Sequence, residues 1–408
     1  KLSSGTYTAK AGTMGITNRK TIENAAFTAG GALTYDGNAD STVTETTMTG
    51  TSVDITNAGT LTNGSYTAET GAMTVKNSGK LSSGTYTAKA GTMGITNEGT
   101  IENGTYTARG DLTYTDIAKS SLTDGTLISE EGKAKITAHG VLQIKKLSAK
   151  DSATVEADHD VTLNEAEAGM LAISSDGSVK ADTLTAKTGN ASVNAKKDVT
   201  IGTLNAKEHA ELTSGGDMAL TEAHANTLTA NAGGKLTATT LGVTGAVDLT
   251  SGGAMEVTEA TVGSVAANAG STLHVKKLTS TGEATLTSKD EATLDDVTAG
   301  TLAAESTAGS VKAGTLTATT GDAEVTAKKD VTIGTLTAEA GGATIEAIDG
   351  KLDVTTLNAK EHAALTSGGA MEVSEATVGS VAANAGSTLH VKKLTSTGEA
   401  TLTSKDEA

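Results

Sequence analysis

The sequence predicts an all-β protein: a right-handed parallel β-helix of about 20 coils with 19–20 residues in each coil. Three observations support this prediction. The chain of 408 residues has no proline, one Phe and 48 glycines, which suits continuous strands and tight corners better than an aromatic-centred globular core. The second observation is an internal repeat, and the third is an alternation of apolar and polar residues inside each repeat. The hand is expected from the crossover preference of parallel strands.

The first part of the chain repeats every 20 residues. Residues 59–118 divide into three blocks of 20 in which Tyr66, Tyr86 and Tyr106 occupy equivalent places. Residues 1–18 recur unchanged at 80–97, an offset of 79 that is close to four blocks. Only whole coils can be added to a stack without breaking its register. An offset close to four blocks therefore indicates that each block is one coil. We therefore expect the three tyrosines in one stack, extended by Tyr7 and Phe27, with hydroxyl groups that need hydrogen-bond partners.

From residue 119 onward the units are about 19 residues long and rich in Ala, Leu and Lys. Residues 249–292 recur at 365–408 with one change, Thr258 to Ser374, and the offset of 116 is close to six units. Within a unit, the alternation predicts two or three short strands, with glycines at corners where a positive φ is needed. In the unit at 184–201 the expected inward residues are Leu184, Ala186, Ala191, Val193, Ala195, Val199 and Ile201.

These patterns predict two continuous β-helical segments. Residues 1–118 form coils of 20 residues rich in Tyr, Asn and Gly, and residues 119–408 form coils of about 19 residues. Because the repeats start and stop part-way, we expect both ends to be cut from a longer polypeptide. Each coil should be stabilised by its two neighbours, so that an aspartate in place of inward Val193 disrupts its surroundings.

The composition also excludes several classes of function. The net charge of −17 disfavours a nucleic-acid partner, which needs a clustered basic surface. No run approaches 18 apolar residues, and the chain has no cysteine. We expect no enzyme, cofactor or catalytic residue, because a catalytic site needs a unique set of groups. Among the seven histidines, His209 and His362 are copies of one position, and so are His274 and His390.

Several runs resemble the repeats of the filamentous haemagglutinin family. They are AHANTLTANAGGKLTATTLGVTGAVDLTSGGAMEV at 223–257 and ATLTSKDEATLDDVTAGTLAAESTAGSVKAGTLTA at 284–318, with NSGKLSSGTYTA at 77–88 and NEGTIENGTYTA at 97–108 in the family's other repeat texture. The resemblance covers nearly the whole chain. It implies a right-handed β-helical exoprotein of a Gram-negative bacterium, extracellular or on the cell surface, exported by two-partner secretion through an outer-membrane transporter. It also implies a role in adhesion, biofilm formation or effector presentation, with a host or bacterial surface receptor or matrix as partner. Lateral or end-to-end self-association is a further expectation.

Two short motifs are candidate binding sites. Asp36, Asn38 and Asp40 have the spacing of the first ligands of a calcium loop, although Ser41 and Thr47 replace the expected glycine and glutamate. The alternative is an ordinary Asp/Asn turn. The residues Arg109, Gly110 and Asp111 form the tripeptide that integrins recognise, at a position where sibling coils have corners. The alternative is a glycine turn flanked by two charges.

Two further patterns keep alternative functions open. The acidic run Glu156, Asp158, His159 and Asp160 could bind a cation weakly, but a solvated coil surface explains it better. A polysaccharide-active enzyme is a separate alternative, since some parallel β-helices cleave polysaccharides with clustered carboxylates in a groove, but the near-identical duplication leaves few unique positions for such a site. Thr-x-Thr pairs could order water on a flat face and bind ice, but threonine is also favourable at outward strand positions, and the rows look interrupted by charges. The pairs are Thr6/Thr8, Thr85/Thr87, Thr105/Thr107, Thr183/Thr185, Thr227/Thr229 and Thr315/Thr317. The leading expectation remains a structural or adhesive fibre.

Overall fold

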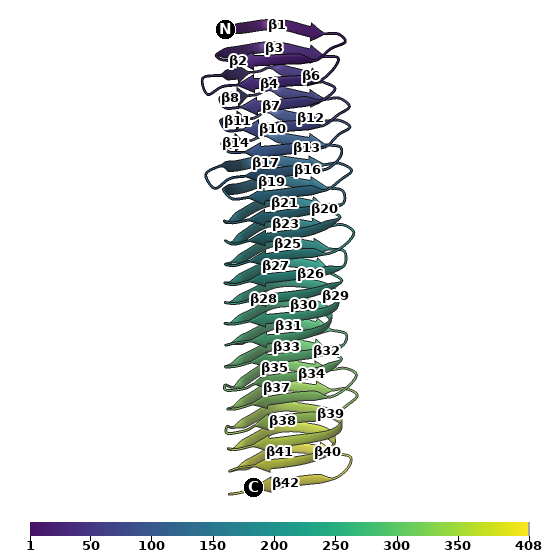
Figure 1. Cartoon of the computed structure of the whole chain (residues 1–408). Coiled ribbons are helices and arrows are strands. Elements are labelled where there is room, and N and C mark those ends of the chain that lie inside the picture. Colours follow the sequence, from purple (N-terminus) through teal and green to yellow (C-terminus); the bar gives the residue numbers. More distant parts are fainter. Residues whose placement is uncertain (407–408) are drawn as a thin grey trace. The chain divides into compact units, whose positions relative to one another are not determined.

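The computed structural model describes residues 1–406, which contain β-strands and no helix. The chain divides into two compact units, residues 1–208 and 209–408. In each unit parallel strands stack as the coils of a β-solenoid, as predicted, with about 21 turns over the two units together (Figure 1). The alternation of apolar and polar residues at period 2 explains why each segment is a strand with one buried face.

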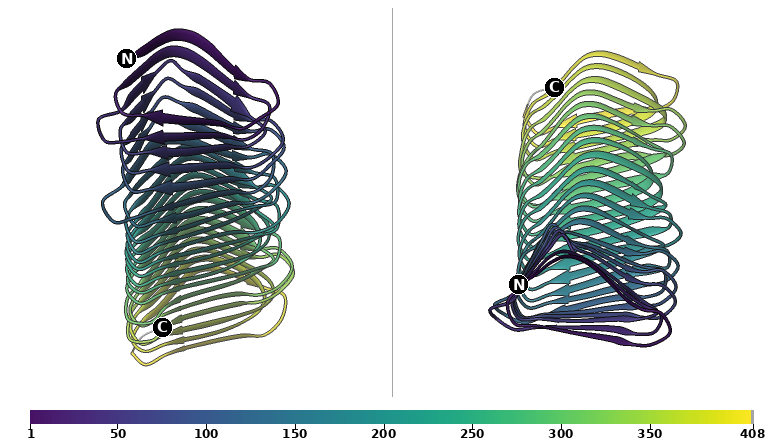
Figure 2. Two further views of the ribbon diagram at one scale, coloured as in Figure 1. Left: turned by 45° about the horizontal axis from the view of Figure 1, so that its top comes forward. Right: turned by 90° about the horizontal axis from the view of Figure 1, so that it is seen from above.

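Each coil in unit 1 is a flattened loop made of an arched strand and a straight strand (Figure 2). In the coils of residues 42–108 a sharp apex divides the arched strand into two short strands, so these coils contain three strands. The strands of unit 1 are β1 (Leu2–Ala9), β2 (Met14–Asn18), β3 (Thr21–Ala29), β4 (Leu33–Gly37), β5 (Thr42–Thr44), β6 (Thr47–Gly50), β7 (Val53–Asn57), β8 (Thr60–Thr62), β9 (Ser65–Ala68), β10 (Met73–Asn77), β11 (Lys80–Ser82), β12 (Thr85–Ala88), β13 (Met93–Asn97), β14 (Thr100–Glu102), β15 (Thr105–Ala108), β16 (Leu112–Asp116), β17 (Ser121–Ser129), β18 (Ala134–Ala138), β19 (Val141–Ala149), β20 (Ser152–Ala157), β21 (Val161–Ala168), β22 (Met170–Ser175), β23 (Val179–Ala186), β24 (Ala191–Ala195) and β25 (Val199–Ala206).

Unit 2 repeats the two-strand coil, and in four places an arched and a straight strand join into one long strand. Its strands are β26 (His209–Ser214), β27 (Met218–Ala225), β28 (Thr227–Ala232), β29 (Leu236–Ser251), β30 (Met255–Ala269), β31 (Leu273–Ser280), β32 (Glu283–Ser288), β33 (Ala292–Ala299), β34 (Thr301–Ser306), β35 (Val311–Ala318), β36 (Ala323–Ala327), β37 (Val331–Ala338), β38 (Ala343–Ala347), β39 (Leu352–Ser367), β40 (Met371–Ala385), β41 (Leu389–Ser396) and β42 (Ala400–Ser404).

The strand register explains the repeat offsets. In unit 1, Leu2 pairs with Ile22, Ile22 with Val43, Val43 with Leu61 and Leu61 with Leu81, which makes four coil steps between the two identical 18-residue segments. In unit 2, six pairings lead from β29 to β39, namely β29–β30, β30–β31, β31–β33, β33–β35, β35–β37 and β37–β39. The predicted relation between offset and whole coils is therefore confirmed.

The buried aromatic stack of unit 1 is also confirmed. The ring centroids of Tyr66 and Tyr86 are 4.8 Å apart, and those of Tyr86 and Tyr106 are 4.7 Å apart. Tyr7 and Phe27 stack at 5.0 Å, and Met48 occupies the place between the two aromatic groups. The predicted inward residues of the unit at 184–201 are all buried.

The hydroxyl groups of the three stacked tyrosines lack the hydrogen-bond partners that we expected. The Oη atoms of Tyr66, Tyr86 and Tyr106 are buried, and within residues 1–406 none has a partner. Burial raises the pKa of all three phenols. A Cβ at Gly84 would lie 3.0 Å from the Tyr86 Oη, so this glycine leaves space for the hydroxyl group.

The expected role of glycine is wrong. Within residues 1–406 no glycine has a positive φ, whereas seven other residues have φ between 50° and 53° at the apex of the arched strand. Asn and Asp are the side chains that best tolerate this conformation. The corner glycines instead allow successive coils to approach, since a Cβ at Gly79 or Gly99 would lie 2.1 Å from a carbonyl oxygen of the coil before it. The seven apex residues are Ser4, Asn24, Glu45, Asn63, Ser83, Asn103 and Asp124.

A buried asparagine ladder follows the straight strands of unit 1. The Asn57 Nδ2 donates to the Asn77 Oδ1 at 2.8 Å, and the Asn77 Nδ2 donates to the Asn97 Oδ1 at 2.9 Å. The Asn97 Nδ2 then donates to the Tyr114 hydroxyl at 3.1 Å. Each amide also reaches backbone carbonyl oxygens at the corner, so that these buried polar groups fix the register of successive coils.

Candidate functional site

The Arg-Gly-Asp tripeptide lies at the corner between β15 and β16, where Arg109 and Asp111 are exposed. The Arg109 Nε donates to the Glu131 carboxylate at 3.1 Å, and this contact raises the pKa of Arg109 and lowers the pKa of Glu131. The Asp111 Oδ1 accepts the backbone N–H of Lys133 at 2.8 Å. Both charged side chains therefore have partners in the next coil.

The contact made by Asp111 recurs at other corners. The Oδ1 atom of Asp160 accepts the backbone N–H of Ser178 at 2.8 Å, and that of Asp330 accepts the N–H of Lys351 at 2.8 Å. Asp111 thus belongs to a class of aspartates that cap a corner of the following coil. The structure gives this side chain a structural role, and receptor binding by the tripeptide stays a prediction.

The two carboxylates of the calcium candidate are already paired with basic side chains, whereas the Oδ1 of Asn38 is buried and has no hydrogen-bond partner among the described residues. Asp36, on β4, pairs with Arg19 at 3.4 Å, and Asp40 pairs with Lys20 at 3.4 Å. Across residues 1–406 no three His, Cys, Asp or Glu side chains are grouped closely enough to hold a metal ion. The geometry supports the alternative interpretation, a polar turn whose carboxylates face lysine and arginine.

Three members of the acidic run line a concave surface of about 500 Å³ on unit 1, whereas Glu156 does not line it and pairs with Lys135 at 3.5 Å. Asp158, His159 and Asp160 lie on its wall together with Asp176 and Lys197 from the following coils.

Each carboxylate of this wall already has a partner. His139 Nδ1 and Asp158 Oδ2 are 2.7 Å apart, which raises the pKa of His139, and Asp176 pairs with Lys196 at 2.8 Å. Asp160 is the corner cap described above. A catalytic groove needs carboxylates that converge on one point, so these separately paired groups favour the solvated-surface interpretation.

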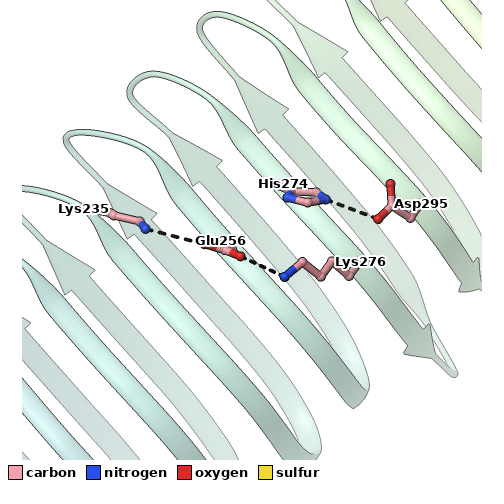
Figure 3. Close-up of polar contacts among 5 residues, drawn as sticks. All are labelled: Lys235, Glu256, His274, Lys276 and Asp295. Atoms are coloured by element: carbon pink, nitrogen blue, oxygen red, sulfur yellow. Dashed lines mark hydrogen bonds and ion pairs between the residues drawn. The ribbon is translucent and has the colours of Figure 1, made fainter.

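The outward face of unit 2 carries rows of ion pairs across neighbouring coils. Figure 3 shows Glu256 between Lys235 and Lys276, at 3.5 and 3.0 Å, with the pair of His274 and Asp295 at 3.2 Å beside them. The hydrogen bond from Lys276 lowers the pKa of Glu256. These groups are substantially exposed, so each pair contributes little stability on its own.

The duplicated block repeats two of the ion pairs of the first copy. Glu372 and Lys392 pair at 2.8 Å in the places that Glu256 and Lys276 occupy in the first copy. Glu375 pairs with Lys393 just as Glu259 pairs with Lys277. The histidines are likewise surface groups, as His274 with Asp295 illustrates. The two copies therefore share these two ion pairs as well as nearly the same sequence.

The threonine pairs of unit 1 form an ordered array, and the expectation that their rows are interrupted by charges is wrong there. We define the threonine array as eight hydroxyl-bearing residues, two on each of the strands β6, β9, β12 and β15. Strand pairing places them in two columns with no charged member. The charges that appear between them in the sequence lie at the corners, where Glu69 pairs with Lys89 at 2.9 Å. The array comprises Thr47, Thr49, Ser65, Thr67, Thr85, Thr87, Thr105 and Thr107.

One column of the array extends further toward the start of the chain. Thr8 pairs with Thr28, and Thr28 pairs with Thr49, so that this column runs unbroken over six coils. The other column is interrupted where Ala26 replaces a hydroxyl-bearing residue, and it resumes at Thr6. In unit 2, Thr315/Thr317 pair with equivalent threonines of β37, but Asp296 lies beside Thr315 in the column. Among the described residues, this array is the longest pair of neighbouring hydroxyl-bearing columns without a charged member.

No family model, curated protein or solved structure matches the chain. The described residues include no helix of the length and hydrophobicity needed to cross a membrane.

Proposed function

We propose that the chain is a spacer segment of a structural or adhesive extracellular fibre. The observation that carries this proposal is the duplicated block of 44 residues, whose two copies are separated by six coil steps and repeat the same ion pairs. A stack of equivalent coils can gain or lose whole coils without loss of its register. Length and the number of weak surface contacts then both scale with the number of copies.

The resemblance to filamentous haemagglutinin repeats supports a more specific form of the proposal. The fibre would belong to the surface of a Gram-negative bacterium, would leave the cell through an outer-membrane transporter, and would contact a surface receptor or matrix. The exposed Arg109 and Asp111 are candidate contacts for such a receptor. Lateral or end-to-end association of the fibres is part of the same proposal. We further propose that the chain is not an enzyme, because duplicated surface groups are poorly suited to a unique catalytic site.

The test is deletion of residues 249–364 from the surface-displayed protein. The deletion joins Asp248 to Leu365, and Leu365 takes the place of Leu249 opposite Ala230. We expect a protein that is still folded, exported and adhesive, with unit 2 shortened by roughly 29 Å, which is six coils at about 4.8 Å each. The matched control is deletion of 249–360, which leaves the following coils out of register and is expected to prevent normal folding.

Two results would contradict the proposal. Complete loss of adhesion with normal folding and export would place a unique binding site in the deleted stretch. Equal behaviour of the in-register and out-of-register deletions would show that whole coils are not the unit that can be exchanged.

A further inference from the structure

The threonine array has the repeat distances of a hydrogen-bonded water lattice. Its coil-to-coil step is given by the tyrosines that alternate with it, whose ring centroids are 4.8 and 4.7 Å apart. Along a strand, residues two apart are separated by about 6.7 Å. In tetrahedral ice with a hydrogen bond of about 2.75 Å, second-neighbour oxygens are about 4.5 Å apart and the axial repeat is about 7.3 Å. Both spacings of the array agree with these values to within roughly a tenth.

The hydroxyl groups of the array are available to solvent. Across residues 1–406 none of the eight side chains donates or accepts a hydrogen bond within the protein, whereas the hydroxyl of Thr113, on a straight strand, donates to a backbone carbonyl. Thr85 is exposed, and Thr87 is half-buried beside it. Each threonine therefore offers one unpaired hydroxyl group and one methyl group to the water above it.

The surface beneath the array is rigid and regular. The rings of Tyr86 and Tyr106 are only 11° from parallel, and those of Tyr66 and Tyr86 are 19° from parallel. Successive coils are therefore nearly aligned, and the strands beneath the array are held by continuous parallel pairing. Water ordered by one coil meets the next coil in almost the same orientation.

The chemistry of the array selects ice over other occupants. A nucleic acid or an anionic lipid would need basic side chains, and the array has no charge. A sugar polymer is commonly held by stacking on exposed aromatic rings, but the three tyrosines of this face are fully buried. The geometry points to a further function beyond that of a spacer: the threonine array binds the surface of ice crystals.

The experiment is capture of the fluorescently labelled chain by a slowly growing ice front. We expect the wild-type chain to enter the ice, and we expect Thr85→Lys to be excluded because it puts a long charged side chain at the centre of the array. The matched control is Thr96→Lys, an exposed site on β13 of the same coil that lies outside the array. The control should be captured like the wild type. Thr85→Val, which keeps the shape but removes the hydroxyl group, provides a second variant if Thr85→Lys fails to fold.

Three outcomes would overturn the inference. The first is exclusion of the wild-type chain from ice. The second is equal capture of the wild type, Thr85→Val and Thr85→Lys, which would show that the array is not the binding face. The third is binding of the wild type to crystalline chitin or cellulose, lost in Thr85→Lys, without capture by ice, because this result would assign the array to a polysaccharide.

Discussion

Replacement of Tyr86 by Phe should stabilise unit 1. The Tyr86 hydroxyl is buried without a hydrogen-bond partner, and an unsatisfied buried hydroxyl group costs about 1–3 kcal/mol. The ring would keep its stacking contacts with Tyr66 and Tyr106 at 4.8 and 4.7 Å, so that little packing is lost. We expect a gain of about 1 kcal/mol in the local free energy of unfolding, at the lower end of this range because removal of the oxygen leaves a small void.

Tyr114→Phe is the matched control and should have the opposite sign. The Tyr114 hydroxyl accepts the Nδ2 hydrogen of Asn97 at 3.1 Å and donates to the Asp116 Oδ2 at 3.0 Å. Asp116 is buried, and its other oxygen accepts the backbone N–H of Gly140 at 3.2 Å. Loss of a hydrogen bond to a buried carboxylate should cost about 1.5–3 kcal/mol.

Native-state hydrogen exchange of the whole chain is the appropriate assay, because long repeat arrays depart from two-state unfolding. A gain of about 1 kcal/mol corresponds to exchange roughly fivefold slower. We expect slower exchange on β9, β12 and β15 in Tyr86→Phe and faster exchange on β13 and β16 in Tyr114→Phe. Faster exchange in both variants would refute the reasoning, since it would show that the Tyr86 hydroxyl makes a stabilising hydrogen bond.

Three further predictions concern other buried groups, the first tested by pH titration and the other two by hydrogen exchange. Burial raises the pKa of the three stacked tyrosines above the unfolded value of 10. Their contribution to stability is therefore complete below pH 10 and falls by about 1.4 kcal/mol per pH unit for each tyrosine above it. Phenolate absorbance near pH 10 in a still-folded chain, in excess of that of a chain with phenylalanine at these three positions, would contradict this. Asn77→Ala removes the hydrogen bonds to Asn57 and Asn97 and should lower the free energy of local opening in the coils on both sides by about 2 kcal/mol. Lys76→Ala should change it little, and equal effects of the two substitutions would argue against a stabilising asparagine ladder. Val193→Asp buries an unpaired charge and should abolish protection locally, whereas Ser192→Asp, on the outward face, should be tolerated; uniform protection in Val193→Asp would count against coil-by-coil stability.

Much of the fold was predictable because the coil length is nearly constant. A step of 20 residues brought Tyr66, Tyr86 and Tyr106 into one stack, and alternation identified buried residues such as Val193. The apex of the arched strand was missed because Asn63 and similar residues adopt a conformation that we had assigned to glycine. The glycines are instead required by the close approach of neighbouring coils, which no single coil reveals.

The surface sites were harder to predict because corners differ in length. From Thr28 to Thr49 the column advances 21 residues, from Thr49 to Thr67 it advances 18, and from Thr67 to Thr87 it advances 20. A constant repeat length therefore fails to align the threonines of this column. In such an alignment the charged corner residues fall between the threonines and appear to interrupt the column. The partners of Arg109 and Asp111 lie about one coil away for the same reason, and only the register identifies them.

Spin labelling of one column in unit 2 tests the in-register stacking of coils, on which both the fold and the exchange of whole coils depend. The chain has no cysteine, so cysteines placed at Thr298, Thr317 and Thr337 would be the only labelled sites. These residues pair with one another, and nitroxides on them should lie about 5 Å apart and give a spectrum dominated by spin exchange. Moving the middle label to Lys312, five residues along β35, should remove the exchange. Separate, non-interacting spectra from the labels at 298, 317 and 337 would contradict the account.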